Sequence, residues 1–99
     1  MSETTAEAAV EAEVDYSMLP EHMREAARCW VDDGIMTGHF LTAVMTNNLT
    51  RAFGYADEKN GAAMERWVQW LCWEIPGVCW GSPEKVAAWR EAKQEERES

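Results

Sequence analysis

A tryptophan-rich stretch, residues 57–80, constrains the fold of this chain more than any other part of it. It reads DEKNGAAMERWVQWLCWEIPGVCW and holds four of the six tryptophans and two of the three cysteines. Apolar residues recur there at the spacing of one helical face, namely Met64, Trp67, Val68, Leu71 and Ile75. Trp70 and Trp73 flank that face and widen it. This helix therefore needs packing partners on more than one side.

Three helices are predicted before this stretch. The first covers residues 20–33 and ends at Gly34, a residue typical of helix C-termini. The second covers residues 37–45, with Thr37 as the expected N-cap. The third covers residues 49–56 and begins after a pair of asparagines, whose side chains compete for backbone hydrogen bonds.

The central helix is expected over residues 57–75, capped by Asp57 and ended by a Pro-Gly pair. A last helix is expected over residues 82–90, because Ser82, a proline and a glutamate form a strong start signal. No segment alternates apolar and polar residues, so no strand is predicted. The predicted fold is all-α, a compact bundle of four to five short helices around the central Trp-rich helix.

Acidic residues concentrate at the two ends of the chain, which has a formal net charge of −9. Residues 1–16 contribute −5, residues 91–99 contribute −2, and residues 17–90 contribute −2. We therefore expect a disordered acidic N-terminal tail over 1–16, a helical domain over 17–90 and a charged C-terminal tail over 91–99. The chain lacks the basic footprint of a nucleic-acid binder and the basic amphipathic helix of a membrane binder.

The remaining chemistry of the sequence points away from catalysis and metal binding. We expect no secretory leader, and the three cysteines fit reduced thiols in a cytoplasmic protein. Neither His22 nor His39 belongs to a motif with a paired nucleophile. Cys72 and Cys79 lie too far apart in sequence for a typical zinc motif. We expect no catalytic residue, no metal and no cofactor, and we expect the thiols to pack as small apolar groups.

Carboxylates at helix ends and flanking tryptophans are the candidate partner-binding residues. Carboxylates in one patch would complement a basic surface, and tryptophan is enriched at interface hot spots. The alternatives are that other helices cover the tryptophans and that the terminal charge only keeps the chain soluble. The candidates are Asp32, Asp33, Asp57, Glu58, Trp70 and Trp73.

Three fragments of the sequence resemble one family. They are LPEHMREAARCWVDDGI, GHFLTAVMTNNLTRAFGYADEKN and WLCWEIPGVCWGSPEKVAAW. Together they resemble small proteins of unassigned activity that tailed phages and prophages encode, and the match spans residues 19–90. The chain departs from the family pattern at Met36-Thr37, where a proline is expected, and at Cys72-Trp73, where Tyr-Asn is expected.

The resemblance implies a phage origin and a task in the cytoplasm of a host cell. The expected function is that of a non-catalytic, anti-CRISPR-like or other anti-defence factor, which binds and inhibits a host protein or protein–nucleic-acid complex. One alternative is an oligomer that sequesters a nucleotide signal between aromatic side chains. Another is a structural or housekeeping protein of a phage.

Overall fold

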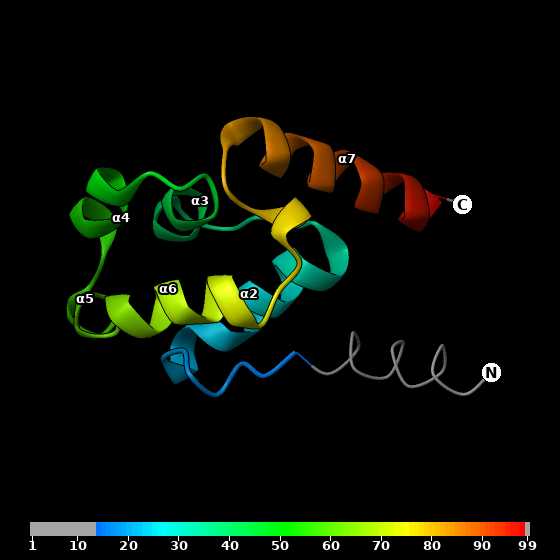
Figure 1. Ribbon diagram of the computed structural model, residues 1–99. Coiled ribbons are helices and arrows are strands. Elements are labelled where there is room, and N and C mark those ends of the chain that lie inside the picture. Colours follow the sequence, from blue (N-terminus) through cyan, green and yellow to red (C-terminus); the bar gives the residue numbers. More distant parts are fainter. Residues whose placement is uncertain (1–13, 99) are drawn as a thin grey trace.

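The protein is a bundle of short helices in the computed structural model, which describes residues 14–98 (Figure 1). Those residues contain no strand, so the all-α prediction is confirmed. None of the helices among them is long and apolar enough to cross a membrane. The elements are α2 (Glu21–Asp33), α3 (His39–Met45), α4 (Leu49–Tyr55), α5 (Glu58–Ala62), α6 (Met64–Trp73), the 3-10 turn η1 (Gly77–Cys79) and α7 (Pro83–Glu98).

Gly34 ends α2 as predicted, and the structure shows why a side chain would not fit there. Its φ of 69° lies in the left-handed region, and its N–H donates to the carbonyl of Trp30. A Cβ at this position would lie 2.7 Å from the Cβ of Lys93 in α7. The glycine therefore serves both the helix end and the close approach of α7.

The start of α3 differs from the prediction that Thr37 caps it. Gly38 is the N-cap residue instead, with a φ of 83°, and no side chain caps the free N–H groups of the first turn. The asparagine pair does more than end one helix, because it also starts the next one. Asn47 adopts a left-handed φ of 64°, and Asn48 caps α4 by accepting a hydrogen bond from the backbone of Arg51.

The central helix is divided at Ala63, so the prediction of one continuous helix over 57–75 is wrong. Asp57 does cap its start, because its side chain accepts a hydrogen bond from the N–H of Asn60. Ala63 then leaves helical geometry, with φ −102° and ψ 11°, and separates α5 from α6. Asn60 turns its side chain inward across this break and accepts a hydrogen bond from the indole of Trp67.

Both ends of the described chain pack differently from the expected tails. The last helix, α7, continues to Glu98 instead of ending near residue 90. Its Trp89 indole donates to the carbonyl of Trp30 at 3.1 Å, which fastens α7 to α2. At the other end, Val14 and Tyr16 pack against the core, although the tail was predicted to include them. The remainder of the predicted acidic tail, residues 1–13, lies outside the described residues.

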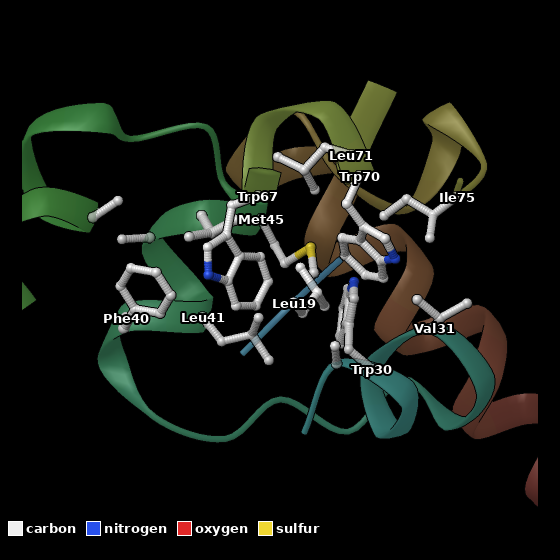
Figure 2. Close-up of a cluster of buried hydrophobic side chains, with 14 of the residues drawn as sticks. Leu19, Trp30, Val31, Phe40, Leu41, Met45, Trp67, Trp70, Leu71 and Ile75 are labelled. Atoms are coloured by element: carbon white, nitrogen blue, oxygen red, sulfur yellow. The ribbon is translucent and has the colours of Figure 1, made fainter. Parts of the chain in front are cut away.

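Three fully buried tryptophans form the centre of the core (Figure 2). The ring of Trp67 packs edge-on against Phe40 and Trp70, with centroids 5.3 and 5.9 Å apart. Trp30 donates its indole N–H to the carbonyl of Cys79, 2.9 Å away. Trp67 donates to Asn60 and Trp70 to the carbonyl of Asp15, so each indole N–H has an acceptor and the cost of burying it is removed. The neighbouring core residues in Figure 2 include Leu19, Val31, Leu41, Met45, Leu71 and Ile75.

Candidate functional site

The four predicted acidic residues do not form one patch. Asp32 and Asp33 lie at the C-terminal end of α2. Asp57 lies beside His22, at the N-terminal end of the same helix, with Oδ2 2.9 Å from Nε2. Ten residues separate His22 from Asp32, which is about 15 Å of helix. Glu58 follows Asp57 at the start of α5, so the structure presents two separate acidic positions.

Each acidic position has hydrogen-bond partners within the chain. Arg97 of α7 donates to the backbone carbonyl of Asp33, which brings a cation to the negative end of the α2 dipole. The N–H of Asn60 and then the His22 ring hold the pKa of Asp57 below its ordinary value of 3.8. The Asp57 carboxylate therefore has a structural role as the cap of α5, whereas at Asp33 it is the backbone carbonyl that has a partner.

The two candidate tryptophans have opposite environments. Trp73 is 81% exposed and is available to a partner. Trp70 is fully buried, so its selection as a contact residue was wrong. The segment before α2 covers it, because the ring of Tyr16 lies 5.6 Å from the Trp70 ring and the carbonyl of Asp15 accepts its indole N–H at 3.0 Å.

A surface that was not predicted lies between α4 and α6. We define the α4–α6 surface by three exposed apolar side chains: Leu49 (62% exposed), Phe53 (54%) and Val68 (49%). Leu49 and Val68 also line an apolar groove of about 40 Å³. The other groove residues are Ala43, Val44, Asn47, Asn48, Ala52, Met64, Trp67 and Leu71. Val68 was expected on the apolar face of the central helix but is 49% exposed, and of the α4 residues only Ala52 is buried.

The three thiols differ in their surroundings. Cys79 is buried, and burial raises the pKa of its thiol to about 11. Burial, with a further contribution from Glu25, also raises the pKa of Cys29. Cys72 is exposed, one helical turn after Val68, so the expectation of packed thiols fails for it. Raised pKa values disfavour the thiolate, which is the nucleophilic form.

A second concave region lies between α2, the start of α3 and α5. We name it the α2–α5 hollow; its volume is about 430 Å³. The rings of His39 and Tyr55 stack on one side of it, with centroids 5.0 Å apart and planes 23° apart. Its other lining residues are Met23, Ala26, Thr37, Gly38, Phe40, Leu41, Asp57 and Asn60. These residues come from four segments of the chain, so sequence spacing does not predict that they line one hollow.

Within residues 14–98, no three His, Cys, Asp or Glu side chains are grouped in a way that could hold a metal ion. Comparisons with known proteins add no identity to this geometry. No family model, no curated protein and no solved structure matches the chain. The resemblance to small phage proteins therefore stays a prediction, and the function is argued from the surfaces described above.

Proposed function

We propose that this chain is a non-catalytic interaction protein that binds and inhibits a component of a host defence system. The observation that carries the proposal is the α4–α6 surface. Leu49 and Val68 expose large apolar side chains that line an apolar groove, and Phe53 is exposed one helical turn after Leu49 on α4. Clustered apolar side chains on a small domain are typical of a protein-contact surface.

The size of the groove favours a protein partner over a small ligand. Its volume of about 40 Å³ is far below the roughly 300–1,000 Å³ of small-molecule sites. It has room for part of one apolar side chain from a partner. Leu49 and Val68 would then surround that side chain and exclude water from it, as contacts around an interface hot spot do.

The negative charge of the chain favours a partner with a basic surface. A net charge of −9 attracts basic surfaces and speeds association with them. Proteins that handle nucleic acid carry such surfaces, and the nucleases of bacterial defence systems belong to this class. The resemblance to phage proteins also favours a defence target. Trp73 is exposed on another side of α6 and lies outside the α4–α6 surface.

Cys72 allows the partner to be identified at this surface. It is exposed one turn from Val68, whereas Cys79 is buried and Cys29 is partly buried. We therefore propose to label Cys72 of a Cys29→Ser variant with a photoreactive maleimide and to irradiate it with purified complexes of defence systems. The expected result is a crosslink to one basic subunit, with loss of that subunit's activity when the unlabelled chain is added.

The double variant Leu49→Ser/Phe53→Ser tests whether the surface is responsible. It should lose both the crosslink and the inhibition, whereas Trp73→Ser should keep most of both. Binding through apolar contacts should also persist when salt is raised to 0.5 M, where surface charges are screened. If the double variant still inhibited as well as wild type, the assignment to this surface would be refuted. If every tested defence complex stayed active in the presence of the wild-type chain, inhibition itself would be refuted.

A further inference from the structure

We propose that the α2–α5 hollow is a binding site for a nucleobase, and that guanine fits it best. The hollow combines an apolar floor, an aromatic wall and polar groups of both hydrogen-bonding kinds. Met23, Ala26, Phe40 and Leu41 supply the apolar residues, and the His39–Tyr55 pair forms the wall. This combination is typical of sites for planar heterocycles.

Asn60 provides a hydrogen-bond donor with a fixed orientation. Its residue is only 3% exposed, and its Oδ1 accepts the indole N–H of Trp67 at 3.2 Å. An indole nitrogen can only donate, so the carbonyl oxygen of Asn60 must face Trp67 and the amide nitrogen must point away from it. That nitrogen has no hydrogen-bond partner within residues 14–98, and Asn60 lines the hollow. The nitrogen is not among the buried polar atoms that lack a partner, so it is open to solvent, and a donor of fixed orientation there can bond a ligand acceptor in place of water.

Asp57 provides the acceptors beside this donor. One of its oxygens accepts the N–H of Asn60 at 2.7 Å, and the other contacts His22 at 2.9 Å. An ionised carboxylate accepts about four hydrogen bonds, so both oxygens keep capacity for ligand N–H groups. Guanine carries two N–H donor groups beside a carbonyl oxygen. Asp57 would accept from the donors and Asn60 would donate to the carbonyl, which is a charge-assisted arrangement.

The aromatic wall supplies the stacking contact. Tyr55 is 48% exposed, and its ring packs nearly parallel to that of His39. A planar base can lie against such a pair, and every nucleobase has a π-face that permits this contact. Donor and acceptor positions, rather than stacking, must therefore distinguish guanine from the other bases.

This site is separate from the surface assigned to the proposed function. The volume of about 430 Å³ admits a nucleoside-sized ligand, whereas the groove of the α4–α6 surface does not. The residues that line the two regions do not overlap. Failure of one proposal therefore leaves the other untouched.

The test is an NMR titration of the full chain, labelled with nitrogen-15. The probes are adenosine, guanosine, cytidine and uridine, each also as its 5′-monophosphate. We expect guanosine to bind most tightly, with saturable shifts of the Asn60 side-chain amide and the Trp67 indole N–H. Equal affinity of guanosine and its 5′-monophosphate would show that the base alone is recognised. The proposal would be overturned if every 5′-monophosphate bound more tightly than its nucleoside while the Asn60 signals did not shift.

Two variants with matched controls complete the test. Asp57→Asn keeps a capping side chain but removes the charge, and it should weaken guanosine binding about tenfold or more. Glu58→Gln removes the same charge one residue away, outside the hollow, and should leave binding unchanged. Tyr55→Ala should weaken binding by a similar factor, whereas Phe53→Ala on the same helix should not. The proposal fails if no probe shifts the Asn60 signals at millimolar concentration, or if Asp57→Asn and Glu58→Gln bind equally well.

Discussion

The indole N–H of Trp67 donates to Oδ1 of Asn60, and this hydrogen bond holds α5 and α6 together across the break at Ala63. Both residues are almost fully buried, Trp67 at 0% and Asn60 at 3% exposure. Asn60 is the only polar or charged residue in the buried set of the described chain. The bond therefore fixes the angle between two helices and orients the Asn60 amide toward the α2–α5 hollow.

Replacing Asn60 by leucine should destabilise the fold. The change removes the acceptor of a buried indole N–H, which costs roughly 1–3 kcal/mol of the free energy of unfolding. Urea denaturation followed by circular dichroism measures this cost. Lys59→Leu, at an exposed position of the same helix, should change the free energy of unfolding by less than about 0.5 kcal/mol. An equal effect of the two substitutions would show that the buried bond contributes nothing.

The tryptophans of α6 should differ sharply in their contribution to stability. Trp67→Ala removes a fully buried ring and should cost about 3–5 kcal/mol, enough to unfold a small domain. Trp73→Ala removes a ring that is 81% exposed and should cost under about 1 kcal/mol. Thermal denaturation of both variants distinguishes them. A large loss of stability in Trp73→Ala would mean that its ring is covered.

Tyr16 allows a test of the segment that covers Trp70. Its hydroxyl is buried and has no hydrogen-bond partner within residues 14–98, while its ring packs on Trp70. Tyr16→Phe should therefore raise the free energy of unfolding by about 1 kcal/mol, because it removes an unsatisfied polar group. Tyr16→Ala should lower the free energy of unfolding and shift the tryptophan fluorescence to longer wavelength. Loss of stability in Tyr16→Phe would reveal a partner for the hydroxyl.

Alkaline pH should destabilise the fold through the same residue. Burial, with a smaller effect of Asp32, raises the pKa of Tyr16 from 10.0 to about 12. The unfolded chain then releases this proton at lower pH than the folded chain does. Its stabilising contribution is complete below pH 10 and is lost as the pH rises toward 12. The stability advantage of Tyr16→Phe over wild type should therefore widen as the pH rises from 10 to 12. A difference that stays constant over this pH range would contradict the raised pKa of Tyr16.

Helix start and end signals in the sequence predict much of this fold, because each acts on backbone groups within one helical turn. Gly34 ends α2, Asp57 caps α5, and Ser82 caps α7 by accepting from the N–H of Lys85. The division at Ala63 could not be predicted in this way. Alanine and its neighbours are typical of a continuous helix, and the hydrogen bond that accompanies the break joins Asn60 to Trp67, seven residues away.

The candidate surfaces were harder to predict than the helices. Trp70 and Trp73 are both aromatic and three residues apart, yet Trp70 packs on Trp67 and the segment before α2 whereas Trp73 is exposed. Likewise, Leu49 and Phe53 have the spacing of a buried face, yet α4 is too short and too peripheral to bury more than Ala52. Exposure of such residues depends on tertiary packing, which periodicity does not contain.

The most direct test of the proposed function is phage plating on bacteria that carry single defence systems and express this chain. For one defence system, the wild-type chain and Trp73→Ser should each raise plating efficiency at least about tenfold. Leu49→Ser/Phe53→Ser should not raise it, and circular dichroism should show that this double variant is folded. Such a result would assign inhibition to the α4–α6 surface. Equal protection of phage by the double variant, or no effect in any defence system, would contradict the account.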